Sequence, residues 1–148
     1  MGLTSSPVAN RSDAGVQYWE RLRGLSGEFD DIITNGSLTS GPVYIDILET
    51  DVAFSFKGNN TLYIVDSNYR GNLKTTFGDG MYIVGIDIEP GRYRSNVGVQ
   101  YWARLKGFSG DFGELIANDA MVEGTAYVEI KQSDVGFETK GAQWIRVE

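Results

Sequence analysis

The feature that most constrains this chain is an internal repeat. Residues 15–65 align with residues 98–148 without a gap, so that GVQYWERLRGLSG falls on GVQYWARLKGFSG at a constant offset of 83 positions. Roughly two in five aligned residues are identical, and most of the others are conservative exchanges. A gapless match of this length implies two copies of one structural unit, related by duplication.

The hydrophobic pattern within each copy is that of β-strands. Residues 43–47 alternate between aliphatic side chains and Tyr44 or Asp46, and residues 126–130 repeat this alternation. Turn residues such as the Gly-Asp-Gly at 78–80 recur at the spacing typical of antiparallel folds. We therefore predict an all-β protein with two small antiparallel β-sandwich or barrel units in tandem. One helical turn is an alternative that the pattern leaves open, over Phe29, Ile32 and Ile33 in the first copy and Phe112, Leu115 and Ile116 in the second.

The two copies differ in completeness. Two strand-like stretches precede the second copy in FGDGMYIVGIDIEPGRYRSN, whereas only the polar tail MGLTSSPVANRSDA precedes the first. We expect this N-terminal arm to be extended unless a partner orders it. The first unit should then have an open sheet edge, covered either by residues 61–77 of the same chain or by the arm or another subunit. The expected parts are an arm at 1–14, a first β unit at 15–65, a linker at 66–77 and a second β unit at 78–148.

The composition excludes several kinds of chemistry. The chain contains no Cys and no His, which removes Ser-His-Asp and Cys-His triads, thiol redox chemistry and ordinary zinc sites. Its net charge of −7 repels a phosphate backbone, and no apolar run is long enough to span a membrane. The start lacks the apolar stretch of a secretory signal, which predicts a protein not exported by that route. We expect no cofactor, no metal, no nucleic acid and no membrane partner.

The motifs GDGMYIVGIDIEPGRYRS, YWARLKGFSG, IAND and FETKG of the second copy carry a family resemblance. They resemble the pattern GDGxYxVGxDIxPGxYR, YWARLxGFSG, IAND and FETxG of a β-rich domain in secreted proteins and lipoproteins of actinobacteria and in proteins of their phages. The likeness covers most of residues 77–148 and, more loosely, residues 15–58. It implies the fold and no particular activity.

The chain departs from this pattern at its cysteines. In the exported relatives one Cys precedes the YW pair and another follows the FETxG segment, which implies a disulfide. Here these positions hold Gln100 and Ala142, and in the first copy Gln17 and Asn59. Disulfides persist in oxidising compartments, so the loss of the bridge in both copies indicates a protein that folds inside a cell.

These observations favour a non-enzymatic structural protein of an actinobacteriophage virion. The expected role is capsid decoration or cementing by a homo-oligomer that adheres to other virion proteins, the major capsid protein first among them. Such a protein is made in the host cytoplasm and ends on the outer surface of the particle. The alternative is a cell-surface or glycan-binding module, including a phage tail or host-recognition component, that presents outward Tyr44, Tyr127 and a Trp.

The candidate interface residues are aromatic and arginine side chains at equivalent positions of the two copies. Consecutive Tyr and Trp residues in a strand point to opposite faces, so only one of each pair can enter the core of its own unit. The other covers a second layer, meets the sister unit or lies at a subunit interface. The arginines lie on the Trp side and are expected to stack on a ring or pair with an acid. The candidates are Tyr18, Trp19, Arg21, Tyr44, Tyr101, Trp102, Arg104 and Tyr127.

Acidic residues offer carboxylates for glycosidic acid/base chemistry, which needs two of them facing each other across a cleft. Nothing in their spacing demands such a pair, and we predict a solvated acidic surface with no catalytic residue. The residues concerned are Asp30, Asp31, Asp87, Glu89, Asp111 and Glu114.

Overall fold

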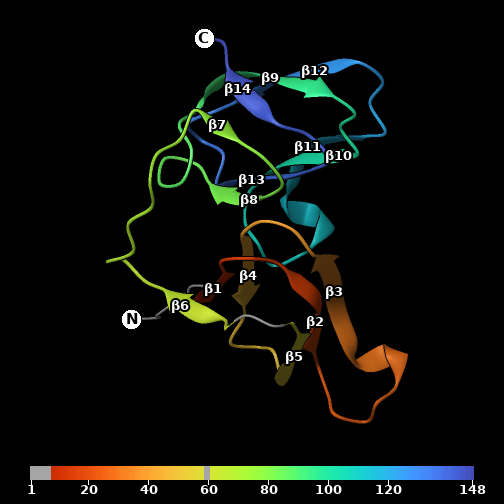
Figure 1. The fold of residues 1–148 in the computed structure, drawn as a ribbon. Helices are drawn as coiled ribbons and strands as arrows, with labels where there is room; N and C mark the ends of the chain where they lie inside the picture. The colour runs from red at the N-terminus through yellow and green to blue at the C-terminus, as the bar shows by residue number, and fades with distance from the viewer. Residues whose placement is uncertain (1–7, 59–60) are drawn as a thin grey trace.

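The computed structural model describes residues 8–58 and 61–148 of the chain, and shows two β-sandwiches in tandem (Figure 1). This confirms the predicted all-β fold with two duplicated antiparallel units. Within the described residues the helical structure is limited to two 3-10 turns, η1 (Phe29–Asp31) and η2 (Phe112–Glu114). The helical turn that the sequence left open is therefore present in part, because Phe29 and Phe112 begin these turns whereas Ile32 and Leu115 begin the strands that follow.

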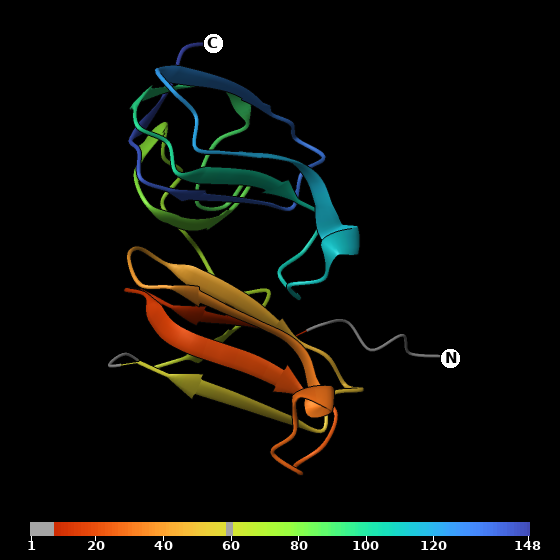
Figure 2. The ribbon, with the colours of Figure 1, turned by 90° about the vertical axis from the view of Figure 1, so that its right-hand side faces the viewer.

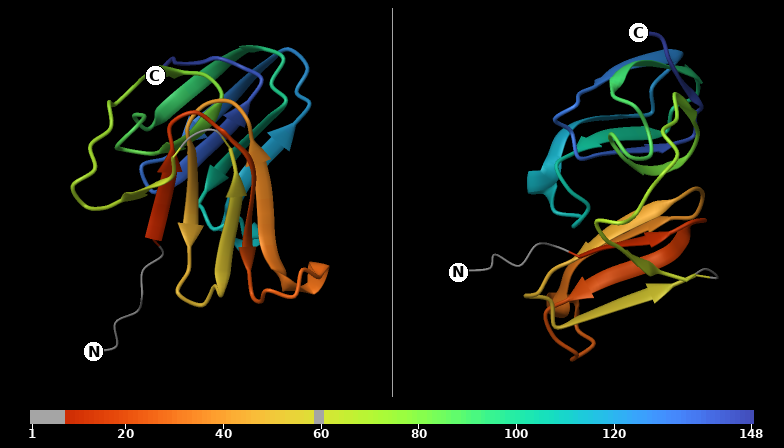
Figure 3. Two further views of the ribbon diagram at one scale, coloured as in Figure 1. Left: turned by 60° about the horizontal axis from the view of Figure 1, so that its bottom comes forward. Right: turned by 90° about the vertical axis from the view of Figure 1, so that its left-hand side faces the viewer.

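The first unit consists of two three-stranded antiparallel sheets, with strand orders β4-β1-β6 and β3-β2-β5. Its strands are β1 (Val8–Ser12), β2 (Val16–Leu22), β3 (Ile32–Leu38), β4 (Val43–Ile47), β5 (Ala53–Lys57) and β6 (Tyr63–Val65). Residues 66–75 then lead as an irregular segment from the first unit to the second (Figure 3).

The second unit consists of two four-stranded antiparallel sheets, with strand orders β12-β9-β14-β7 and β11-β10-β13-β8. Its strands are β7 (Thr76–Phe77), β8 (Gly80–Ile83), β9 (Gly91–Val97), β10 (Tyr101–Leu105), β11 (Leu115–Ala120), β12 (Thr125–Ile130), β13 (Gly136–Lys140) and β14 (Trp144–Arg146). Strands β9 to β14 correspond in order to β1 to β6. Strands β7 and β8 have no counterpart in the described part of the first unit.

Strand β1 corrects the expectation of an extended N-terminal arm. Residues 8–12 form the central strand of their sheet, pairing with β4 on one side and with β6 on the other. The polar stretch hid this strand, because two of its inward positions are Asn10 and Ser12, which are buried. The Ser12 hydroxyl is satisfied there by donating to the Gly15 carbonyl at 2.9 Å. Residues 1–7 of the expected arm lie outside the described residues.

The two cores differ in size. The second unit packs Tyr93, Phe137 and Trp144 with no solvent exposure, and the Trp144 indole donates to Thr139 Oγ1 at 2.8 Å. The first unit has a smaller core around Val16, and part of it is covered from outside. The other buried members of the first core are Trp19, Leu38, Val43 and Ile45, and Met81 of the second unit packs against them.

Candidate functional site

The two units meet where a loop of the second unit, residues 106–111, lies against β4 of the first (Figure 2). The Asp46 N–H donates to the Phe108 carbonyl at 2.8 Å, and the Phe108 N–H donates to Asp46 Oδ2 at 2.9 Å. The Phe108 ring packs against Tyr44, with centroids 5.2 Å apart. Because both residues of this exchange are buried, the loop is part of the fold rather than a surface appendage.

Both candidate arginines form ion pairs with acids, which settles between the two roles that the sequence allowed. Arg21 Nε lies 2.8 Å from Asp51 Oδ2, and Arg104 Nε lies 2.7 Å from Asp134 Oδ2 at the equivalent place. Arg21 also donates to the Ser109 carbonyl across the junction at 2.7 Å. The hydrogen bonds from Arg21 lower the pKa of Asp51. Arg21 therefore links the first unit to the junction loop.

Tyr44 corrects the expectation of an outward ring. It is fully buried, and its hydroxyl donates to Asp87 Oδ2 at 2.6 Å and accepts a hydrogen bond from Arg11. The Tyr69 hydroxyl lies 3.3 Å from both the Tyr44 hydroxyl and Asp87 Oδ1. Burial, followed by the hydrogen bond to Asp87, raises the pKa of Tyr44. A polar cluster therefore fastens β4 of the first unit to the second unit.

Asp87 also corrects the expectation of a solvated acid. It is buried and, besides the Tyr44 bond, accepts the Ile83 N–H at 2.9 Å. Other acids of that group have structural partners as well. Asp31 accepts the N–H and hydroxyl of Ser26, and Glu114 accepts the N–H and hydroxyl of Ser109 at the equivalent place.

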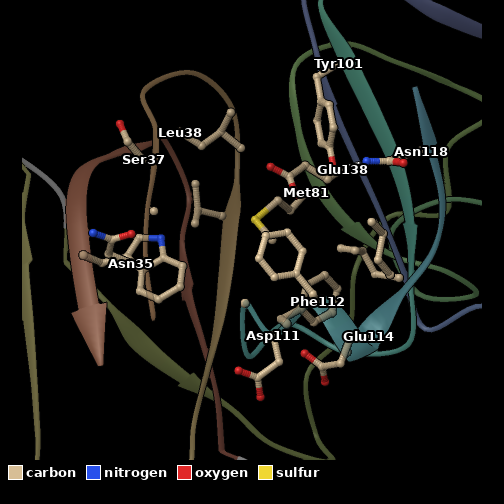
Figure 4. Close-up of a pocket in the computed structure, with 18 residues that line it drawn as sticks. Asn35, Ser37, Leu38, Met81, Tyr101, Asp111, Phe112, Glu114, Asn118 and Glu138 are labelled. Atoms are coloured by element: carbon tan, nitrogen blue, oxygen red, sulfur yellow. Dashed lines mark hydrogen bonds between the residues drawn. The ribbon is translucent and has the colours of Figure 1, made fainter. Parts of the chain in front are cut away.

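A cleft of about 250 Å³ lies beside the junction loop, between the two units (Figure 4). Its first-unit wall includes Trp19 and Leu38, and its second-unit wall includes Tyr101, Met81 and the carboxylates described next. The walls are largely apolar, and the lining contains no Lys or Arg. Such a cleft suits an uncharged or cationic group better than an anion.

Three carboxylates line the cleft, and they are not alike. Asp111 and Glu114 are both hydrogen-bonded to the Ser109 hydroxyl. Glu138 extends from β13 and has no hydrogen-bond partner among the described residues. Burial raises the pKa of the Glu138 carboxyl, because the charged form loses hydration that nothing replaces.

We predict that Glu138→Gln stabilises the protein above acid pH. The native state holds a proton on Glu138 that the unfolded chain releases near pH 4.3. Wild-type stability therefore falls as pH rises from about that value through the raised native pKa. The variant should show a higher Tm than wild type at pH 7 to 8 and no difference below about pH 4, by circular dichroism. Glu123→Gln, at an exposed position, is the control, and an unchanged pH profile in Glu138→Gln would contradict the prediction.

The remaining candidate residues lie as follows. Trp19 is 7% exposed and Tyr18 is 37% exposed, so the prediction of opposite faces holds for this pair. Tyr101 and Trp102 are both half-buried, with Tyr101 lining the cleft and Trp102 stacked on Phe137 at 6.2 Å. Tyr127 is 63% exposed, although its repeat equivalent Tyr44 is buried.

Sequence reasoning missed the junction loop, the buried role of Asp87 and the unpaired Glu138. One signal was available for the loop. Its centre reads GFSG in the second copy and GLSG in the first, which keeps a large apolar residue, Phe108 or Leu25, in a turn where polar residues are usual. Glu138 aligns with Ser55, so the repeat itself marked position 138 as a departure.

The comparisons with known proteins identify a family. The model of the Rv1352-like extracellular domain matches residues 3–61 and 74–145, one segment for each copy of the repeat. Neither the curated proteins nor the solved structures give a match. The described residues contain no helix with the length and hydropathy needed to cross a membrane. Since the two matched segments together cover most of its length, the chain belongs to the family of Rv1352-like extracellular domains.

Proposed function

We propose that this chain is a non-enzymatic structural module that acts by adhesion to other protein chains, including further copies of itself. The observation that carries the proposal is the edge of the first unit at β5, which no described strand covers. An edge strand presents a row of unpaired N–H and C=O groups, and these are a template for association with another chain. The hydrogen bonds that occupy Asp111 and Glu114 support a role without catalysis.

The repeat shows what β5 lacks. Its equivalent β13 is flanked by β10 and β8, whereas β5 pairs only with β2 in the part of the chain that the structure describes. On the inner face of β13, Phe137 and Thr139 have no solvent exposure. The equivalent Phe54 is half-buried, and Phe56 is 42% exposed. In the second unit β8 covers this side of the interior, whereas the equivalent side of the first unit is exposed beside β5.

Strand β6 repeats this incompleteness in the other sheet. Its equivalent β14 lies between β9 and β7, whereas among residues 8–58 and 61–148 β6 pairs only with β1. Two of its three residues, Tyr63 and Ile64, are large apolar side chains that are 36% and 66% exposed. Exposed apolar side chains beside unpaired strand edges mark an interaction surface.

The finer proposal is a place on the outer surface of an actinobacteriophage particle, as a capsid decoration or cement protein. Membership of an extracellular family supports an exterior location. Gln100 and Ala142 stand where the exported relatives have cysteines, which supports folding in a reducing cytoplasm before release. The net charge of −7 supports an outer surface over a lumen that faces nucleic acid, and a non-nucleic-acid partner such as the major capsid protein.

The test is the mass of the purified protein by multi-angle light scattering over a range of concentrations. We expect wild type to associate, and Phe56→Lys to be monomeric because a charge then occupies the open margin. Leu73→Lys is the matched control, because Leu73 is also a large apolar residue, 55% exposed, in the irregular segment between the units. A monomeric wild type at every concentration would contradict the proposal.

A further inference from the structure

We infer that the first unit carries the same docking loop as the second, and that this loop binds the second unit of another copy, head to tail. The inference rests on the proposed function and names its partner and its surface. In each chain the second unit already docks onto the first through residues 106–111. The equivalent residues 23–28 form a loop in the first unit with no second unit beneath it (Figure 2).

The surface beside the docking loop is present in both units. The first unit has an open hollow of about 260 Å³ beside its loop. The loop and the strand ends beside it line this hollow. At the repeat offset of 83, each of their lining residues corresponds to a residue that lines the cleft between the units. These first-unit residues are Leu22, Gly24, Leu25, Gly27, Glu28, Asp31 and Ile32. The first unit therefore presents half of a cleft whose other half is absent from the same chain.

The exposures of equivalent residues show which surfaces lack a partner. Leu25 is 77% exposed, and its equivalent Phe108 is 4% exposed in the junction. On the receiving side, Tyr127 is 63% exposed, whereas Tyr44 is fully buried in the junction. Leu25 is thus apolar like Phe108, and Tyr127 is a tyrosine like Tyr44, but in this chain both Leu25 and Tyr127 are exposed.

The backbones of the two loops also differ only in whether a neighbour covers them. Gly27 and Gly110 have left-handed φ angles of 83° and 86°. A Cβ on Gly110 would come within 2.9 Å of the Trp19 ring, whereas a Cβ on Gly27 would meet no atom of the described residues within 4 Å. The two loops have the same turn, and only one of them is covered.

The receiving strand is also duplicated. Both β4 and β12 lie at the edge of their sheets. Asp46 opposes Ala9 on β1, and Glu129 opposes Arg92 on β9, which are equivalent positions. The Asp46 N–H points away from its sheet to reach Phe108, so the Glu129 N–H points outward in the same way. Glu129 is exposed and supplies the carboxylate that Asp46 supplies in the junction.

Each molecule therefore has one free docking loop, residues 23–28 (the donor loop), and one free receiving strand, β12 (the receiver). In Figure 2 the loop after β10 extends from the second unit toward the first, the loop after β2 extends in the same direction away from the second unit, and β12 lies at the opposite end of the molecule. The open edge of β5 is on the same side as the donor loop. A contact between different surfaces of identical chains is heterologous, and it generates open chains or closed rings.

The contact between copies should be weaker than the junction within a chain. The first unit has no described equivalent of β8, which supplies a further hydrogen bond from the Met81 N–H to the Pro42 carbonyl. Leu25 also buries less area than Phe108 can. Association therefore depends on protein concentration, whereas the junction is held by the linker.

The test uses two variants, Leu25→Asp in the donor loop and Tyr127→Asp on the receiving face, studied by sedimentation velocity. Wild type should associate progressively with concentration, and each variant alone should be monomeric. An equimolar mixture should form a dimer and nothing larger, because the intact receiver of the Leu25→Asp chain binds the intact loop of the Tyr127→Asp chain. A twofold-symmetric contact would not be rescued by mixing.

Phe29→Asp is the matched control. Phe29 is 89% exposed, and its equivalent Phe112 remains 93% exposed beside the formed junction, so the variant should associate like wild type. Near-ultraviolet circular dichroism verifies that each variant is folded. Association of wild type that neither Leu25→Asp nor Tyr127→Asp reduces would overturn this inference and leave the proposed function standing. A monomeric wild type would overturn both.

Discussion

Replacing Arg21 by methionine should lower the free energy of unfolding by about 3–5 kcal/mol. The guanidinium is 2% exposed and donates to both oxygens of Asp51, whose side chain is 1% exposed. Removing it leaves a buried carboxylate without its counter-ion and leaves the Ser109 carbonyl without a donor. Urea-induced unfolding at pH 7, followed by tryptophan fluorescence, measures the difference.

The repeat supplies the control for this substitution. Arg104→Met removes the equivalent ion pair with Asp134, but the Arg104 side chain is 15% exposed, and both of its hydrogen bonds within the described residues go to that carboxylate. Its cost should therefore be smaller. Equal costs at the two positions would show that the junction adds nothing to the stability that Arg21 supplies.

The cost of Arg21→Met should also diminish in acid. Arg21 lowers the native pKa of Asp51, so its contribution is fully present above the unfolded Asp pKa of about 3.9 and is lost as pH falls through the native value. The gap between wild type and variant should thus narrow below about pH 4. A gap that widens on acidification would contradict the assigned ion pair.

Phe108→Ala should cost about 3–5 kcal/mol of unfolding free energy, as is usual for a buried phenylalanine. Its ring lies between Tyr44 and the backbone of β13, where a Cβ on Gly136 would come within 2.3 Å of it. Truncation therefore opens a cavity in the junction. The measurement is denaturant unfolding at low protein concentration, where copies do not associate.

Leu25→Ala is the matched control, because Leu25 occupies the same place in the same loop with 77% of its surface exposed. Its effect on the unfolding free energy should remain within about 0.5 kcal/mol. If both substitutions were equally costly, the loop would be needed for local folding rather than for contact between units. If both were neutral, the junction would not contribute to stability.

The local features of the fold were predictable, because they depend on neighbours in sequence. Alternation identified the strand at 43–47, and the consecutive Tyr18 and Trp19 separated to opposite faces as the pleat requires. The shared register of the arginines placed them on the Trp face, and the acids that they meet are identical in the two copies. Each of these inferences could be checked against the equivalent position of the other copy.

The junction was not predictable by the same means. Tyr44 and Tyr127 occupy the same position in the same alternating pattern, yet one is buried and the other is 63% exposed. The difference arises from which unit lies above each strand, and no local pattern encodes it. Strand β1 escaped notice for another reason, since VANRS places polar side chains at inward positions that hydrogen bonds satisfy.

The unequal number of strands in the two halves gives the molecule a polarity. A protein made of two four-over-four sandwiches would cover the interior of both units, and one made of two three-over-three sandwiches would leave both interiors partly open. One of each leaves a partly open interior in one unit only, so that the two ends of the molecule present different surfaces. A chain assembled head to tail from such molecules would have two different ends, and a copy in which only one of the two surfaces can bind would cap one of them.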